Sequence, residues 1–284
     1  MLDTVTFAGE WPARIRLPGT RMVPLEKSSP VRLRGDASGR MLQRVECSLP
    51  RLLFGHNGRA LENQGEINEA FTLLHSRLDT VAHVSDVSGW SIQRADIAWN
   101  FDLPARALIV AHSTLSVPGI HGVGTLWKGG QGVTWTGANS RFGVKLYDKP
   151  REMDIPGSVL RAEVSLRSDH LRRHLRGNDW RNFDTLYAIY RGIMAGIPAI
   201  AAPAGKGDWQ EAIGRHLPCE LRTLVLADLA HKSERTLREY RRRIEAAAAQ
   251  LPATFSWATQ LPPDGPPPAV HVVPRNPSAR PATE

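Results

Sequence analysis

Residues 146–152, Leu-Tyr-Asp-Lys-Pro-Arg-Glu, place a tyrosine among charged side chains. Tyr147 is one of only four tyrosines in the chain, and it stands at the end of an apolar strand pattern. We expect its ring at the exposed end of that strand, next to Lys149. A phenolic oxygen beside a cation can attack a phosphodiester, because the cation favours the ionised, nucleophilic form. The segment therefore predicts nucleophilic catalysis by Tyr147 with Lys149 as its partner.

Three further acidic residues, Glu46, Asp96 and Glu163, lie on segments that read as strands with apolar neighbours. A carboxylate that is buried on such a strand must be paired or must bind a metal. Three convergent carboxylates supply the oxygen ligands that Mg²⁺ or Mn²⁺ prefers. The alternative stays open that neighbouring arginines neutralise these carboxylates instead: Arg94, Arg161 and Arg167.

Residues 226–244 resemble a helix-turn-helix, in which the small Ala227 and Ala230 let two helices approach and Ser233 caps the second helix. Residues 231–245 carry six Lys and Arg against three Glu. Such side chains can contact phosphates or guanine edges. The equal alternative is an ordinary basic amphipathic helix. The predicted DNA-contacting residues are Lys232, Arg235, Arg238, Arg241 and Arg242.

The elements that must position these residues follow from hydrophobic periodicity. Apolar residues recur at helical spacing over 66–84, and alternate as in a strand over 91–103. The pattern indicates an α+β fold in which antiparallel hairpins occupy the middle of the chain. Short strands are expected over 5–47, further strands at 124–127, 132–136, 142–147 and 158–167, and helices at 103–111, 168–175, 182–194, 208–216, 220–230 and 233–250.

Three regions follow from this order of elements. Residues 1–178 are predicted to form an antiparallel-sheet catalytic core with flanking helices, and residues 179–251 a helical region that contains the helix-turn-helix. Residues 252–284 hold nine prolines, which is typical of an extended or disordered tail.

Charge and composition indicate which class of partner and which compartment the chain suits. The net charge of +8 and the isoelectric point near 10 favour a polyanion such as nucleic acid. Two cysteines without a CxxC motif indicate a reducing compartment. The start of the chain lacks the pattern of a signal peptide, and no apolar run is long enough to span a bilayer, so we expect no membrane association.

Taken in order, several segments between residues 45 and 175 resemble the gene II/X replication initiators of filamentous phages, a rolling-circle replication family. The matching pieces are Val-Glu-Cys-Ser-Leu-Pro-Arg-Leu-Leu-Phe-Gly-His-Asn at 45–57, Arg-Ala-Asp at 94–96, Thr-Trp at 134–135, residues 146–152, and Leu-Arg-Ala-Glu-Val-Ser-Leu-Arg at 160–167. No His-hydrophobic-His motif is present, which argues against the two-histidine rolling-circle nickases.

The resemblance implies a protein that nicks one strand of a supercoiled, double-stranded origin and stays attached to its single-stranded product through a tyrosine. It assigns that role to Tyr147, with Lys149 beside it. It also implies metal ligation, with Mg²⁺ or Mn²⁺, by Glu152, Asp96 and Glu163. The implied partners are host helicase and polymerase in the bacterial host cytoplasm. Residues 55–57, Gly-His-Asn, also match the family but receive no role.

Two other functions remain compatible with the sequence. The chain can be a non-enzymatic DNA-binding regulator built around residues 220–245, or a metal-dependent nuclease in which water replaces Tyr147. Formation of a covalent protein–DNA adduct separates the nickase from both alternatives, because only a tyrosine nucleophile leaves one.

We expect the joint change of Arg238 and Arg241 to Ala to weaken DNA binding if residues 233–250 enter a groove. Each lost phosphate contact should reduce the slope of log affinity against log salt by about 0.9. The slope is measured by fluorescence anisotropy at several salt concentrations. An unchanged slope and affinity would leave the segment as a structural amphipathic helix.

Overall fold

The computed structural model describes residues 1–17, 19–26, 29–82, 91–112, 117–120, 124–127, 130–137, 141–174, 181–201 and 254–273. Antiparallel strands combine with helices in these ranges, so the predicted α+β class is confirmed. The helices predicted at 208–216, 220–230 and 233–250 lie outside the described residues, as do the five basic residues predicted to contact DNA. No helix of the described ranges has the length and apolar character needed to cross a membrane.

The chain divides into two compact units. The first comprises Met1–Asn100, Glu163–Ile189 and Pro268–Glu284, and the second comprises Phe101–Ala162 and Tyr190–Pro267. The chain thus passes between the units several times, and neither is one continuous stretch of sequence.

The first unit is built on a sheet in the order β2-β3-β4-β1-β5-β9. β1 pairs antiparallel with both β4 and β5, and β3 pairs antiparallel with β4 and β2. The strands are β1 (Leu2–Pro12), β2 (Val23–Pro24), β3 (Val31–Gly35), β4 (Met41–Ser48), β5 (Ser91–Phe101) and β9 (Leu160–Arg167), whose last five residues belong to this unit.

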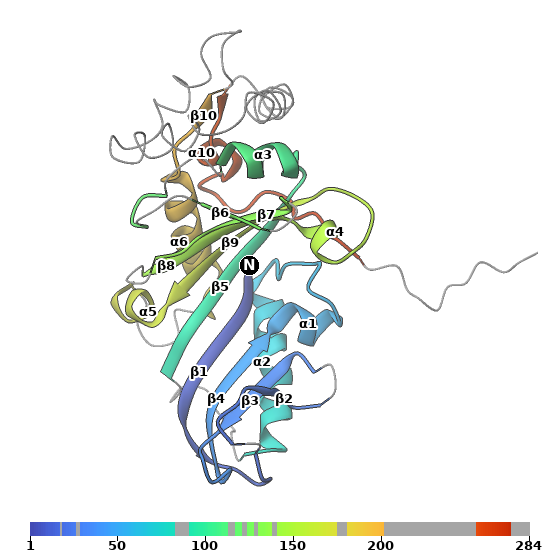
Figure 1. The fold of residues 1–284 in the computed structure, drawn as a ribbon, viewed down its shortest axis with the longest axis vertical. Helices are drawn as coiled ribbons and strands as arrows, with labels where there is room; N and C mark the ends of the chain where they lie inside the picture. Colours follow the sequence, from blue (N-terminus) through green and yellow to red (C-terminus); the bar gives the residue numbers. More distant parts are fainter. Residues whose placement is uncertain are drawn as a thin grey trace, which may run out of the picture. The chain divides into compact units, whose positions relative to one another are not determined.

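Strand alternation gives this sheet one apolar face and one polar face, since successive side chains point to opposite sides. Helices α1 (Leu49–Phe54) and α2 (Gln64–Asp79) accompany the sheet (Figure 1), and the Phe7 ring meets the Phe71 ring of α2 edge-on at 6.4 Å. Each large apolar side chain buried in this way stabilises the fold by about 2 kcal/mol. The fully buried apolar residues of the strands include Val5, Phe7, Val31, Val45, Cys47, Ala95 and Ile97.

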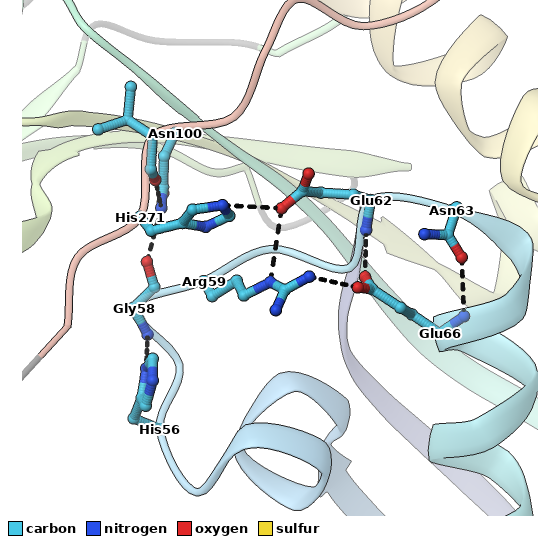
Figure 2. Close-up of polar contacts among 9 residues, drawn as sticks. His56, Gly58, Arg59, Glu62, Asn63, Glu66, Asn100 and His271 are labelled. Carbon is cyan, nitrogen blue, oxygen red and sulfur yellow. Dashed lines mark hydrogen bonds and ion pairs between the residues drawn. The ribbon is translucent and has the colours of Figure 1, made fainter.

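Helix α2 begins where its cap is formed, two residues before the periodic pattern predicted. Asn63 Oδ1 accepts a hydrogen bond from the Glu66 backbone N–H at 3.0 Å, and Glu66 Oε2 accepts one from the Glu62 N–H at 2.7 Å. The first bond satisfies a donor that the first turn leaves unpaired, and the second ties the residue before the cap to that turn. Arg59 pairs with Glu62 and Glu66, and His271 Nε2 lies 3.2 Å from Glu62 Oε1 (Figure 2).

An extended segment near the C-terminal end packs against the start of this network (Figure 2). Asn100 Nδ2 donates to the carbonyl oxygens of Gly58 at 2.9 Å and Val270 at 2.8 Å, and the Val272 N–H donates to the Gly58 carbonyl at 2.9 Å. A Cβ on Gly58 would lie 1.7 Å from the Val272 carbonyl oxygen, so only glycine permits this approach.

The second unit contains β6 (Thr125–Leu126), β7 (Gly132–Trp135), β8 (Phe142–Asp148) and the first three residues of β9. β7 pairs antiparallel with β6 and with β8. The other elements are α3 (Ala105–His112), α4 (Lys149–Glu152), the short strands β10 (Ile200–Ala201) and β11 (Thr254–Phe255), α10 (Trp257–Gln260) and the C-terminal part of α6 (Phe183–Ala195). Helix α5 (Ser168–His174) belongs to the first unit.

The described part of the proline-rich region differs from the disordered tail that composition predicts. Within 254–273, Phe255, Trp257 and Leu261 are buried, and Arg191 Nε donates to the Leu261 carbonyl at 2.9 Å. The reason is that a few large apolar side chains anchor the segment between its prolines, and average composition does not register them. The region boundaries predicted from sequence stay predictions.

A buried histidine ties α10 to α3 inside the second unit. His112 Nε2 accepts a hydrogen bond from the Trp257 indole N–H at 2.9 Å, and its Nδ1 bonds the Leu108 carbonyl at 2.8 Å. This pattern requires a neutral imidazole with its proton on Nδ1. Burial lowers the pKa of His112 from 6.5 to about 4, although the hydrogen bond to Leu108 opposes that shift.

We expect His112 to make folding sensitive to acid. Because its folded pKa lies below the unfolded one, its contribution is complete above pH 6.5 and is lost as the pH falls through about 4, by about 3 kcal/mol. Urea unfolding at pH 7 and pH 4.5 measures the loss. A His112→Gln variant should be less stable at pH 7 but should lose less on acidification. An equal loss in both proteins would contradict the assignment.

Candidate functional site

Strand β8 holds Tyr147 opposite Gly132 of β7. A Cβ on Gly132 would lie 2.7 Å from the Trp127 ring and 2.9 Å from Tyr147 Cβ. The missing side chain therefore lets the Trp127 indole lie across the strand and stack on the Tyr147 ring, with centroids 5.1 Å apart and planes at 27°. Trp127 Nε1 donates to Thr134 Oγ1 at 2.7 Å, which fixes the indole in this position.

Lys149 follows at once because the chain turns into α4, whose first turn contains Pro150. The Lys149 backbone N–H donates to the Val159 carbonyl at 2.9 Å, and its side chain is completely buried. Lys149 Nζ lies 5.7 Å from the Tyr147 ring centroid and 2.7 Å from Glu152 Oε2. A buried ammonium needs such a carboxylate. Its position over the Tyr147 ring is that of a cation–π contact, in which the ring face attracts the ammonium.

The expectation of an exposed strand end is wrong, because Tyr147 is only 5% exposed. The stacked Trp127 comes from a neighbouring hairpin, and the pattern of β8 alone gives no sign of it. The cluster of Trp127, Tyr147, Lys149 and Glu152 is named the tyrosine cluster below. It brings together three of the predicted site residues, and it assigns Glu152 to the ammonium of Lys149. Ligation of a metal by Glu152 stays a prediction.

The first unit places two other predicted site residues, Glu46 and Asp96, on the polar face of its sheet. Thr6 of β1 lies opposite Glu46 of β4 and opposite Arg94 of β5, so the three side chains share one face. Asp96 lies two residues beyond Arg94 on the same face. Arg94 Nε donates to Asp96 Oδ1 at 2.7 Å and Arg94 Nη2 to Asp96 Oδ2 at 2.6 Å, so both carboxylate oxygens bind the guanidinium.

Arg94 binds Asp96 and lies in the electrostatic field of Glu163 and Glu46. Burial by itself lowers the pKa of the Arg94 guanidinium. The charge and hydrogen bond of Asp96 and the charges of Glu163 and Glu46 raise it by more, so the net shift of the pKa is upward. Glu163 is 5% exposed on β9, and Ser165 Oγ lies 3.5 Å from its Oε1. The structure therefore pairs Asp96 with Arg94 and Glu46 with Arg32, which favours the alternative of arginine pairing for these two carboxylates.

The fit of these carboxylates to a divalent cation depends on Arg94. Oxygen donors suit Mg²⁺ or Mn²⁺, but both oxygens of Asp96 bond to Arg94, and Glu46 Oε1 lies 3.2 Å from Arg32 Nη1. Among the residues that the structure describes, no group of three or more His, Cys, Asp or Glu side chains is arranged to hold a metal. Ligation would require the Arg94 side chain to leave Asp96.

The tyrosine cluster belongs to the second unit, and Glu46, Asp96 and Glu163 belong to the first.

The family-matching sequence Gly-His-Asn at 55–57 has a structural role. Gly55 ends α1 with φ of 78°, and His56 Nδ1 accepts a hydrogen bond from the Gly58 N–H at 3.2 Å. Sequence reasoning missed Trp127 and Gly132. The glycine-punctuated hairpins were a signal, since a glycine within a strand marks a close approach by other atoms.

Comparison with known proteins gives little further information. No protein-family model matches the chain, and no curated protein matches it. Among solved structures, the chain is similar to a rolling circle replication initiator protein from Geobacillus stearothermophilus, with 16% identity and a TM-score of 0.40 over 80% of this chain and 95% of that chain. This TM-score does not establish a shared fold, so no residue role is transferred from it.

We expect Asp96→Asn to destabilise the first unit by about 1–3 kcal/mol, because it leaves Arg94 facing a neutral group at a site only 3% exposed. Glu46→Gln is the matched control: its partner Arg32 is 50% exposed, and such pairs contribute below about 1 kcal/mol. Urea unfolding measures both changes. Equal losses would show that the pairing of Arg94 with Asp96 is not the stabilising contact.

Proposed function

We propose that this protein is a tyrosine-nucleophile DNA nickase that initiates rolling-circle replication of a phage or plasmid. One observation carries the proposal: the fully buried Lys149 ammonium lies 5.7 Å from the Tyr147 ring centroid and is held there by Glu152. A cation near a tyrosine is one means of lowering the pKa of its phenol and so of activating it as a nucleophile. The resemblance of the surrounding segments to the gene II/X initiators agrees with it.

The energetics support a role for Lys149. A phenol with a pKa of about 10 is ionised to about one part in a thousand at neutral pH, a cost of about 4 kcal/mol. A neighbouring ammonium in a poorly solvated site lowers that cost. Glu152 keeps the ammonium charged and in place, so Lys149 is proposed to act on the Tyr147 oxygen electrostatically.

The proposed reaction conserves the phosphodiester bond. The Tyr147 oxygen loses its proton and bonds to phosphorus, while the bond from phosphorus to the 3′ oxygen breaks. The 3′ oxygen takes up a proton and becomes the hydroxyl that primes synthesis. The 5′ phosphate stays on Tyr147 as an ester, and attack by a 3′-hydroxyl on that ester closes the strand.

Glu46, Asp96 and Glu163 are the proposed ligands of Mg²⁺ or Mn²⁺, with Glu152 as a further predicted ligand. Such an ion, when bound, would neutralise charge on the phosphoryl oxygens. Arg94 competes with the ion for Asp96 and can itself hydrogen-bond a phosphate. Origin DNA, double-stranded before nicking and single-stranded after it, is the proposed partner, and the net charge of +8 suits it. Host helicase, polymerase and a bacterial cytoplasmic location remain parts of the proposal.

We expect Tyr147→Phe to abolish nicking and adduct formation while DNA affinity changes less than about threefold, because only the nucleophilic oxygen is removed. The protein is incubated with Mn²⁺ and labelled single-stranded oligonucleotides that carry a randomised core. A denaturing gel then detects protein-linked label. Tyr187→Phe is the matched control, since Tyr187 and Tyr147 are each 5% exposed.

The outcomes separate the possible functions. An adduct that persists in Tyr147→Phe but not in Tyr187→Phe would overturn the choice of nucleophile. Cleavage without any adduct in the unmodified protein would indicate a nuclease that uses water. Binding without cleavage, on both oligonucleotides and supercoiled plasmid, would indicate a DNA-binding regulator.

A further inference from the structure

Two arginines lie directly opposite each other on the sheet of the first unit. Arg34 of β3 pairs in register with Arg44 of β4, and Ala8 of β1 follows on the other side of Arg44. The adjacent row, two residues along each strand, pairs Arg32 with Glu46 at 3.2 Å. The two cross-strand pairs therefore differ in net charge: Arg32 and Glu46 neutralise each other, whereas Arg34 and Arg44 place two positive charges side by side.

A like-charge pair at this spacing destabilises a sheet. Arg34 and Arg44 are both half-buried, so solvent screens their repulsion only in part. In the described part of the chain, neither guanidinium pairs with an acidic side chain, and Arg34 Nε is buried without a hydrogen-bond partner. A buried donor that lacks an acceptor costs about 1–3 kcal/mol. The pair thus presents two neighbouring guanidinium groups that no acidic side chain of the described residues neutralises, and an anion with several acceptor oxygens would offset their repulsion.

The direction of these side chains follows from strand alternation. Leu33 and Val45, their neighbours in sequence, are buried on the apolar face that packs with α1 and α2. Arg34 and Arg44 therefore point to the other face, which also carries Arg94. An anion bound to the arginine pair would lie on the same face of this sheet as the carboxylates around Arg94.

We propose that Arg34 and Arg44 form a phosphate-binding site for the nucleic-acid backbone. Guanidinium groups bind phosphate oxygens through paired N–H donors, and two of them on adjacent strands supply a rigid double contact. The site deepens the proposed function, on which it rests for the identity of the nucleic acid. It is separate from the basic residues predicted at 232–242, and it acts on affinity and not on bond breakage.

We expect the double variant Arg34→Gln/Arg44→Gln to bind DNA about one to two orders of magnitude more weakly at 0.1 M salt. The slope of log affinity against log salt should fall by about 1.8 on a duplex, or about 1.4 on a single strand. Fluorescence anisotropy with labelled DNA of mixed sequence measures both. Without DNA, the double variant should melt at the same temperature or higher, because a repulsive pair is gone.

A matched control removes the same charge from the other side of the unit. Arg51 of α1 and Arg77 of α2 are both exposed. The double variant Arg51→Gln/Arg77→Gln should leave the salt slope within about 0.3 of that of the unmodified protein. An equal fall of the slope in both double variants would reduce the effect to net charge. An unchanged slope in Arg34→Gln/Arg44→Gln would overturn the site. Polyglutamate that binds the unmodified protein as tightly as DNA does would also overturn it, because the arginine pair would then not select phosphate.

The result is independent of the nicking assay. If the double variant at saturating DNA still forms adducts and only its affinity falls, both proposals stand. A fall of the salt slope in a protein that never forms an adduct would retain the phosphate site and reject the nickase. Adduct formation that depends on Tyr147, together with an unchanged slope in the double variant, would reject the phosphate site alone.

Discussion

The arrangement of the first unit depends on one constraint, the burial of the apolar face of its sheet against α1 and α2. Phe7 packs edge-on to Phe71, and Val5, Val31, Val45, Cys47 and Ala95 are buried on the same face. Because side chains alternate along a strand, the residues between them must lie on the opposite face. This is why Glu46 of β4 shares one face with Arg94 and Asp96 of β5, although the two strands are distant in sequence.

The charges on that surface are settled locally by pairing. Arg94 takes both oxygens of Asp96 and stands in the field of Glu46 and Glu163. A guanidinium and a divalent cation offer the same carboxylates a positive charge, but the guanidinium is attached to the chain and needs no uptake from solution. A metal ion could therefore bind Asp96 only if it displaced the Arg94 side chain from this carboxylate.

In the second unit, the position of Trp127 over Tyr147 depends on a residue without a side chain, Gly132. Gly132 leaves room for Trp127 to cover Tyr147, and α4 starts at the residue that carries the ammonium. Burial makes the charge of Lys149 more effective, since a poorly solvated ammonium acts on its neighbours with less screening. The same burial makes Glu152 necessary, because an unpaired ammonium there would be costly. The proposed reactivity and the stability of this cluster thus both require Lys149 and Glu152 to be paired.

Strand and helix periodicity within the sequence determined the α+β class, the strands that carry Asp96, Tyr147 and Glu163, and the helix that became α2, because local alternation is enough to specify them. The clustering of Tyr147 with Lys149 and Glu152 also followed from their spacing. Tertiary structure alone decided that Trp127 covers Tyr147, that Arg94 takes both oxygens of Asp96, and that Arg34 faces Arg44. Each depends on the register between strands distant in sequence or on a side chain from another hairpin, and neither leaves a trace in local periodicity.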